Sequence, residues 1–151
     1  MLDQSKKLSY AIETVFHIAY TAGGRPIRSR DLAKWQGLPH RYLEQAMQKL
    51  VHSSVLRGIR GPNGGYVLAR ERRRITLGEI ARIVCEPVNL EEKIDNNQRS
   101  TIYDSILEPI WNDLEGIVMN KLDQITVQDL CKEANRLGIK RRVDSKIDFS
   151  I

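Results

Sequence analysis

Apolar residues recur at helical spacing in the first twenty residues of the chain. Over residues 8–19 they fall at every third or fourth position, which is the period of an amphipathic helix. The pair Gly23–Gly24 then ends the pattern. The sequence therefore predicts a first helix of about four turns.

Two further helical patterns follow in quick succession. Residues 30–37 predict a short helix, with Ser29 as its N-cap and Gly37 just past its end. Pro39, at or near a first helical position, opens a longer helix over residues 39–55. The connection between them is only a few residues long, which is typical of a helix-turn-helix.

The longer of these helices has two chemically distinct faces. One predicted face is apolar and faces the core: Leu43, Ala46, Met47 and Leu50. The other is polar and open to a partner: Arg41, Glu44, Gln45, Gln48, Lys49 and His52. An amphipathic helix of this kind buries one side and offers the other.

A glycine-rich stretch separates the short apolar runs "VLRGIR" and "YVLA". Residues 61–65, Gly-Pro-Asn-Gly-Gly, suit a turn, so the two runs predict a β-hairpin. Arg57 and Arg60 would point to opposite faces of a regular strand. We therefore expect a β-bulge at Gly58, which would let both arginines face the same way.

The second half of the chain predicts three more elements. Thr76 and Glu79 have capping-box spacing at the start of "ITLGEIARIVCE". Residues 86–100 lose periodicity and predict a loop. From Thr101 a long helix follows, in which Pro109 introduces a kink or marks the true start. Its apolar stripe consists of Ile102, Ile106, Ile110, Leu114, Ile117, Val118 and Leu122.

A last capped helix, "TVQDLCKEANRLG", precedes a basic tail that we expect to be frayed. The fold class is mainly α with a small β-hairpin: a winged helix-turn-helix followed by a long helix. The predicted organisation is a winged domain over residues 1–86, a loop over 87–100, the long and C-terminal helices over 101–138, and the tail over 139–151.

Length and composition are those of a soluble globular protein with one core. The chain has 151 residues and 17.3 kDa, of which 41% are hydrophobic and 28% charged. No apolar run is long enough to cross a bilayer, so no membrane partner is expected. The first residues show no signal-peptide pattern, and we expect a cytoplasmic protein.

The net charge of +5 hides a marked asymmetry. Residues 25–74 carry a charge of +9, residues 75–135 carry −7, and residues 136–151 carry +3. A positive field over the hairpin and the two helices before it favours a polyanionic partner for that segment. A solvated basic face is the alternative that charge alone leaves open.

Spacing decides between two roles for the glycine-rich loop. The stretch lacks GxxxxGK[ST] and leads from one strand into another, so no helix N-terminus is available to hold a phosphate. A β-hairpin beside a helix-turn-helix is instead a wing. We therefore predict a protein that binds double-stranded DNA through the third helix and the wing.

Residue types suggest how these elements would contact DNA. In the major groove, His40, Arg41, Glu44 and Gln45 would face base edges, with Arg suited to guanine and Gln to adenine. The residues expected at the backbone are Arg28, Ser29, Arg30 and Lys49, with the Tyr42 ring packed and its hydroxyl at the phosphates. In the wing, Arg57 would contact phosphates and Arg60 would enter the minor groove. The tip residues Gly61, Asn63 and Gly64 would approach the DNA closely. Glu44 and Gln45 could alternatively form only helix-surface pairs.

Other kinds of site find little support in the residues. Cys85 and Cys131 stand far apart, and no HExxH or Cys/His spacing joins the histidines His17, His40 and His52, so no metal is expected. No paired-carboxylate, Ser-His-Asp or Cys-His arrangement supports an enzyme. Both cysteines are expected to sit reduced in packed surroundings.

The chain resembles the bacterial Rrf-type winged-helix regulators, the group that includes IscR, NsrR and CymR. The resemblance rests on "YAIETVFHIAYTAGGRPIRSRDLA", "YLEQAMQKLVHSSVLRGIRGPNGGYVLAR" and "ITLGEIARIV", and more loosely extends to "ITVQDL". It implies a transcriptional regulator that binds a near-palindromic operator as a homodimer, and we expect it to act as a repressor. The dimer would be held by the long helix through Ile102, Ile106, Ile110, Leu114, Ile117 and Val118.

The chain departs from this family at its sensing site. The resemblance implies three clustered cysteines and an iron-sulfur cluster in the loop before the long helix, but residues 86–100 contain no cysteine. Ser9 stands where some relatives place a further ligand, and a hydroxyl is a poor substitute. We therefore expect no cofactor. Regulation by a protein partner, a small-molecule effector or a thiol redox switch at Cys85 or Cys131 stays open.

Overall fold

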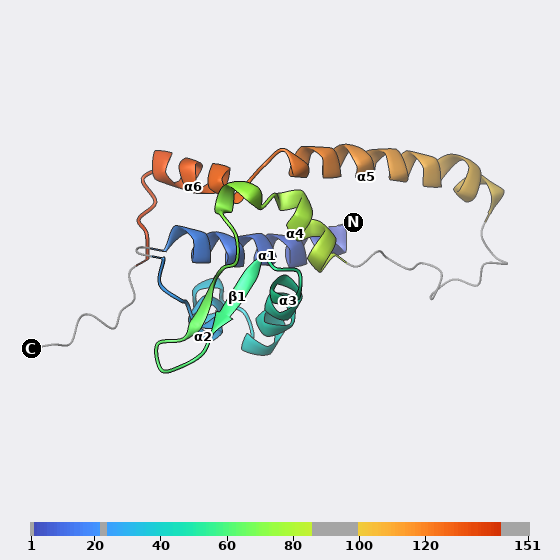
Figure 1. The fold of residues 1–151 in the computed structure, drawn as a ribbon. Helices are drawn as coiled ribbons and strands as arrows, with labels where there is room; N and C mark the ends of the chain where they lie inside the picture. Colours follow the sequence, from blue (N-terminus) through green and yellow to red (C-terminus); the bar gives the residue numbers. More distant parts are fainter. Residues whose placement is uncertain (1, 22–23, 86–99, 143–151) are drawn as a thin grey trace, which may run out of the picture.

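The computed structural model describes residues 2–21, 24–85 and 100–142. Helix α1 (Leu2–Tyr20) runs through the middle of the molecule (Figure 1). On one side of it lie α2 (Ser29–Gln36), α3 (His40–His52) and a hairpin of β1 (Leu56–Ile59) and β2 (Gly65–Leu68). The mainly α architecture with a two-stranded hairpin confirms the predicted winged helix-turn-helix.

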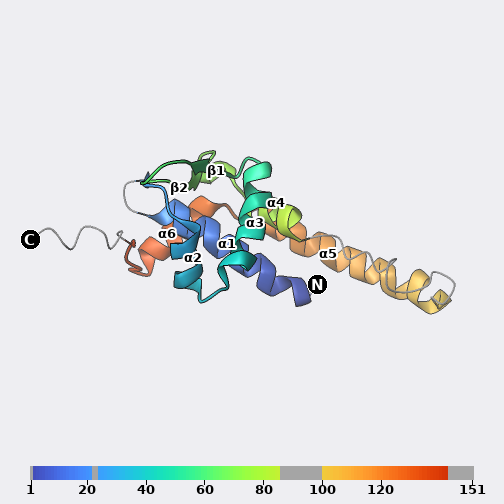
Figure 2. The ribbon, with the colours of Figure 1, turned by 90° about the horizontal axis from the view of Figure 1, so that it is seen from below.

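The remaining elements lie on the other side of α1 or project away from it. A short 3-10 helix, η2 (Arg72–Arg74), leads into α4 (Leu77–Val84). From residue 100 onward come the π-helical turn η5 (Tyr103–Leu107), α5 (Glu108–Asp123) and α6 (Val127–Arg136). Figures 1 and 2 both show α5 extending well beyond the rest of the molecule. None of the helices in the described residues combines the length and apolar character that crossing a bilayer requires.

One apolar core joins α1 to the helices and strands around it. Its fully buried side chains include Val15 from α1, Leu32 from α2, Leu43, Met47 and Leu50 from α3, Ile80 from α4 and Val127 from α6. A buried polar residue, Thr14, lies among them. Its hydroxyl donates to the Tyr10 carbonyl at 2.8 Å and accepts from Gln36 Nε2 at 2.8 Å, which fixes the end of α2 against α1.

The turn between α2 and α3 follows the sequence prediction at one end and departs from it at the other. Gly37 adopts the left-handed conformation, φ 65°, and its N–H closes α2 on the carbonyls of Ala33 and Lys34. The predicted N-cap at Ser29 is wrong, because Arg28 is the capping position and makes no side-chain cap bond. Pro39 precedes the first residue of α3 as its N-cap.

The hairpin has a regular antiparallel register, with Leu56 opposite Leu68 and Ile59 opposite Gly65. The predicted bulge at Gly58 is therefore wrong: Gly58 pairs directly with Tyr66. Strand β1 ends at Ile59, so strand alternation does not set the direction of Arg60.

The hairpin is fastened to the segment before α2. Ile27 and Tyr66 exchange two backbone hydrogen bonds, of 3.0 and 2.8 Å. Gly65 passes so close that a Cβ there would lie 2.6 Å from the Ile27 carbonyl carbon and oxygen, so only glycine fits without moving the backbone.

Helices α4 and α6 both begin at a threonine cap. The Thr76 hydroxyl accepts from the Glu79 N–H, while the Glu79 side chain binds Arg70 Nη2 at 2.5 Å. At α6 the predicted cap is confirmed, and Thr126 and Asp129 form a complete capping box.

Helix α6 buries Val127, Cys131 and Ala134 in the same core as α1. The prediction groups α6 with the long helix over residues 101–138, whereas its apolar face packs into the winged domain.

The segment after α6 is also attached to the core. The Tyr20 hydroxyl donates to the Ile139 carbonyl at 2.7 Å, and the Ile139 N–H reaches the Ala134 carbonyl at 2.9 Å. For residues 139–142 the prediction of a frayed tail is therefore wrong. Residues 143–151, and the loop prediction for 87–99, lie outside the described part of the chain.

Helical backbone begins at Thr101, eight residues before Pro109, so the prediction that Pro109 marks the true start of the long helix is wrong. Helix α5 begins at Glu108 with Pro109 in its first turn, and the π-helical turn η5 precedes it. The α5 segment buries no residue. The apolar stripe of the predicted long helix runs from Ile102 through η5 into α5, and we call it the α5 stripe. Its residues are exposed by between 39 and 64%: Ile102, Ile106, Ile110, Leu114, Ile117 and Val118.

Candidate nucleic-acid interface

The N-termini of α2 and α3 are joined by polar side chains. Ser29 Oγ lies 2.7 Å from His40 Nε2, and the same His40 nitrogen lies 3.4 Å from Glu44 Oε1. Three predicted contact residues are thus brought together at one corner of the helix-turn-helix. His40 and Glu44 remain about 40% exposed, so this corner stays open to a partner. The pairing favours the alternative of a helix-surface pair for Glu44.

The outer flank of α3 is open along its whole length. Leu43, Met47 and Leu50 fix the helix from below because all three are buried in the core. The side chains exposed on the flank are Arg41, Tyr42, Gln45, Gln48 and His52. Such a flank can enter the major groove, where Arg and Gln form paired hydrogen bonds with guanine and adenine.

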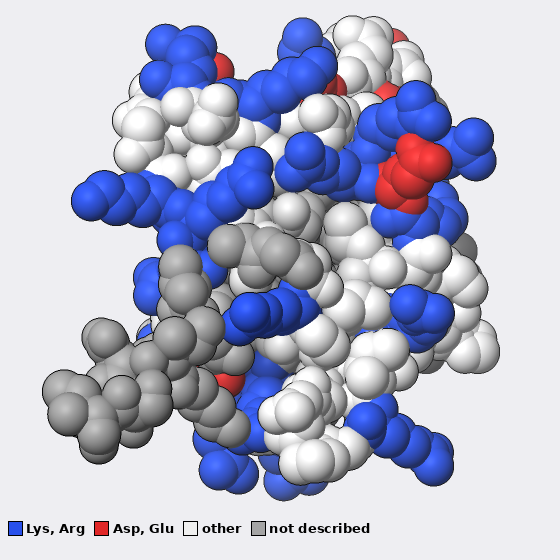
Figure 3. Space-filling model, turned by 60° about the vertical axis from the view of Figure 1, so that its left-hand side comes forward, with Lys and Arg blue, Asp and Glu red and all other residues white. Residues whose placement is uncertain are grey.

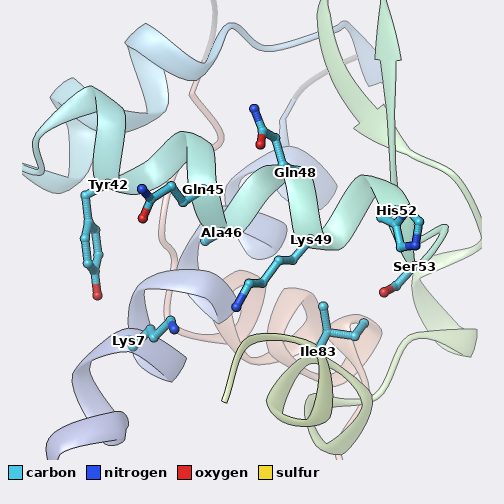
Figure 4. Close-up of a pocket in the computed structure, with 9 residues that line it drawn as sticks. All are labelled: Lys7, Tyr42, Gln45, Ala46, Gln48, Lys49, His52, Ser53 and Ile83. Carbon is cyan, nitrogen blue, oxygen red and sulfur yellow. The ribbon is translucent and has the colours of Figure 1, made fainter. Parts of the chain in front are cut away.

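The Tyr42 ring packs edge-on against the Tyr10 ring, with centroids 6.4 Å apart, and is 41% exposed. The packed ring agrees with the sequence interpretation of this tyrosine. Its hydroxyl lies at the rim of an open groove of about 790 Å³ beside α3 (Figure 4).

Cationic and polar groups from two helices line this groove. Lys7 of α1 approaches it from below, and Lys49 extends from α3 toward the same side (Figure 4). Ile83 of α4 supplies an apolar wall. The sequence does not single out Lys7, because the positive charges of Lys6 and Lys7 are balanced by the negative charges of Asp3 and Glu13.

The wing tip is exposed beside the start of α2. The predicted contact residues Arg57, Arg60, Gly61 and Asn63 are all exposed, and Gly64 is half-buried. A Cβ on Gly64 would lie 2.2 Å from the Ile59 carbonyl oxygen, which requires glycine in this turn.

Arg28 fixes the wing to the helix-turn-helix. Its Nη2 donates to the Pro62 carbonyl at 2.5 Å, although the sequence analysis assigned Arg28 to the DNA backbone. Arg30 is exposed on α2 and Lys49 is half-buried on α3. The wing tip, the start of α2 and the start of α3 therefore form one surface in which basic residues predominate.

The two thiols lie apart and in different surroundings. Cys131 is buried in the core, and Cys85 lies half-buried at the end of α4. Burial raises the pKa of both thiols above the ordinary value for cysteine. No group of three or more His, Cys, Asp or Glu side chains suited to a metal occurs in the described residues. A cluster held by three neighbouring thiolates does not fit a chain with two cysteines so placed.

Comparisons with known proteins agree with this geometry. A model of the Rrf2 family, described as iron-dependent transcriptional regulators, matches residues 4–133. The HTH-type transcriptional regulator IscR of Vibrio campbellii is 27% identical over 147 residues, covering 97% of this chain and 86% of that protein.

Two solved structures are similar over most of their length. IscR of T. potens has 29% identity and a TM-score of 0.70, covering 91% of this chain and 92% of its own. CymR of B. subtilis, described as its global cysteine regulator, has 28% identity and a TM-score of 0.67, covering 88% and 98%. The chain accordingly belongs to the Rrf2 family, and it is a DNA-binding transcriptional regulator, not an enzyme.

Proposed function

We propose that this regulator recognises a specific DNA sequence through α3 and the wing, as a homodimer on a near-palindromic operator, and acts as a repressor. One observation carries the proposal: the polar flank of α3 and the wing tip are exposed together on the segment that holds a charge of +9. Positive charge attracts the duplex, and the side chains of α3 select among base pairs.

Each group has a distinct proposed role. Arg41 and Gln45, both exposed on α3, would contact base edges in the major groove. Arg60 at the wing tip would enter the minor groove, and Arg57 would meet phosphates. Arg28 would act mainly by holding the wing tip, because its guanidinium donates to the Pro62 carbonyl.

The α5 stripe supports the dimer. Six aliphatic side chains are exposed in a row on a helix that projects from the core. A second copy would cover this surface by twofold symmetry and remove the apolar area from water. The same symmetry would place two α3 helices on one side of the duplex, which suits a near-palindrome.

The proposal includes no iron-sulfur cluster. The chain offers two separated thiols, and the raised pKa of both leaves little thiolate at neutral pH. The same property argues against a fast thiol redox switch and favours regulation by a protein partner or a small-molecule effector.

Selection of DNA fragments from the host genome, followed by mobility-shift titration against random duplex, tests this function. We expect some fragments to bind at least about 10³-fold more tightly than random DNA at physiological salt. Equal affinity for every fragment would contradict sequence-specific recognition.

A further inference from the structure

Two arginines near the end of the described chain are held over aromatic rings of the helix-turn-helix domain. The Arg141 guanidinium carbon lies 5.3 Å from the centroid of the Tyr20 ring, and that of Arg142 lies 4.8 Å from the centroid of the Trp35 ring. Each is a cation–π contact. We call residues 139–142 the C-terminal strap, because they run from α6 to α1 and α2.

A hydrogen bond anchors the start of the strap, and the ring contacts hold its end. The Tyr20 hydroxyl donates to the Ile139 carbonyl at 2.7 Å, and Gly138, with φ 71°, turns the chain after α6. Both arginines are nevertheless exposed, as is Lys140 between them and α6. The strap thus presents two arginine side chains held over rings and, next to them, the exposed Lys140.

The ring contacts leave the hydrogen-bonding capacity of the arginines in place. A cation–π contact engages the charge of a guanidinium over a ring and uses none of its five N–H donors. Those donors suit the oxygens of a phosphate, and holding the side chain in advance lowers the entropy lost on binding.

The strap continues the basic surface of the proposed DNA interface. Arg142 lies on Trp35 of α2, and Arg28, just before α2, holds the wing tip at Pro62. On this end of the molecule lysine and arginine side chains are numerous and acidic side chains are few (Figure 3). Helix α2 itself carries two exposed cations, Arg30 and Lys34.

The place of the strap in the whole molecule indicates which DNA it would meet. In Figures 1 and 2 the last described residues lie at the opposite end from α5. In a dimer joined through α5, each strap would therefore lie on the outer side of its recognition helix, far from the twofold axis. DNA beyond the edge of the operator would pass that side.

We propose that Lys140, Arg141 and Arg142 contact the phosphates of the duplex that flanks each operator half-site. The contact is independent of sequence and widens the footprint of each protomer. This inference rests on the proposed function, since it requires that α3 and the wing bind an operator.

The test compares two duplexes for the full-length protein: the selected operator alone, and the operator with ten random base pairs added on each side. The wild type should bind the longer duplex about tenfold more tightly at 0.1 M salt, with a salt slope steeper by about 3 per strap. Arg141→Gln/Arg142→Gln should lose most of that gain, about 2 of the slope per strap, and bind the short duplex within twofold of the wild type.

Two further variants separate charge from position and structure. Lys121→Gln/Lys132→Gln removes the same charge from exposed sites on α5 and α6 and should keep the gain. Arg141→Lys/Arg142→Lys, which keeps the charge, should keep most of it. Lys140→Gln, which leaves both arginines on their rings, should reduce the slope by about 1 per strap even if the arginine variant unfolds.

Several outcomes would overturn the proposal. It fails if flanking DNA adds nothing to the affinity of the wild type, or if Arg141→Gln/Arg142→Gln keeps the whole gain. An equal loss on both duplexes would show that the strap only positions α2. In each of these cases specific binding to the short operator would leave the proposed function standing, whereas a failure to select any operator would remove the function itself.

Discussion

Arg41 and Gln45 are the residues on which base recognition depends most directly, because both are exposed on α3 and neither is needed in the core. Arg41→Ala and Gln45→Ala should each cost about 1–3 kcal/mol of discrimination between the operator and a single-base variant. Anisotropy titration with matched duplexes measures this difference. Lys121→Ala on α5 is the control and should leave discrimination unchanged. Unaltered discrimination in both α3 variants would contradict their role at the bases.

His17 should make stability depend on pH. Its ring contacts the rings of Phe16 and Trp35. Burial lowers the pKa of His17 by more than the hydrogen bond to Glu13 raises it, and the charge of Arg142 lowers this pKa further. The unfolded chain therefore binds this proton more tightly than the folded protein. The contribution of His17 to stability is fully present above the pKa of the unfolded chain, about 6.5. It declines as pH falls from there through the lowered pKa of the folded protein.

Chemical denaturation of the wild type and His17→Gln between pH 5 and 7.5 measures this dependence. The variant should show a flatter dependence in that window, whereas His52→Gln, at an exposed position on α3, should keep the wild-type slope. A wild type that gains stability on acidification from pH 6.5 would contradict the direction of the shift.

The sequence predicts contacts between neighbouring residues better than contacts between residues on different helices. The Gly37 and Thr126 caps depend on neighbouring residues, and both were predicted from local spacing. Ser29 was assigned to a cap, but its hydroxyl meets His40, eleven residues away on another helix. Such contacts depend on how helices pack, which spacing along one segment does not encode.

Among the elements, the wing requires one of its strand glycines, Gly65, but not the other, Gly58. Gly65→Ala would force a Cβ to within 2.6 Å of the Ile27 backbone and should lower the free energy of unfolding by about 1–3 kcal/mol. Gly58→Ala, in the same hairpin, meets nothing within 4 Å and should change it by less than about 0.5 kcal/mol. Thermal unfolding of the two variants measures the difference. Equal effects would mean that β2 is not fastened to Ile27.

The errors in predicting elements have physical causes. The bulge at Gly58 was inferred by assuming that Arg60 belongs to β1, but the strand ends at Ile59. The basic tail was expected to fray because its composition is polar, whereas Tyr20 and Trp35 hold residues 139–142 from positions more than a hundred residues earlier. Amphipathic helices were predictable since their pattern repeats every turn.

At the scale of the whole molecule, the exposed stripe on α5 sets the expected assembly. Ile106→Lys/Ile110→Lys should yield a folded monomer, since neither residue belongs to the core of the described chain and buried lysines would oppose the dimer. Sedimentation velocity measures the assembly. Asn112→Lys/Glu115→Gln adds the same charge at exposed positions away from the stripe and should stay dimeric. A double-lysine variant that remains dimeric would place the interface elsewhere.

Hydroxyl-radical footprinting of the wild type on its selected operator tests the central claim most directly, because it records where α3 and the wing of both protomers lie on the duplex. We predict two protected stretches related by a twofold axis, with centres separated by one helical turn or a multiple of it. A single protected stretch, or uniform protection along the whole duplex, would contradict the account.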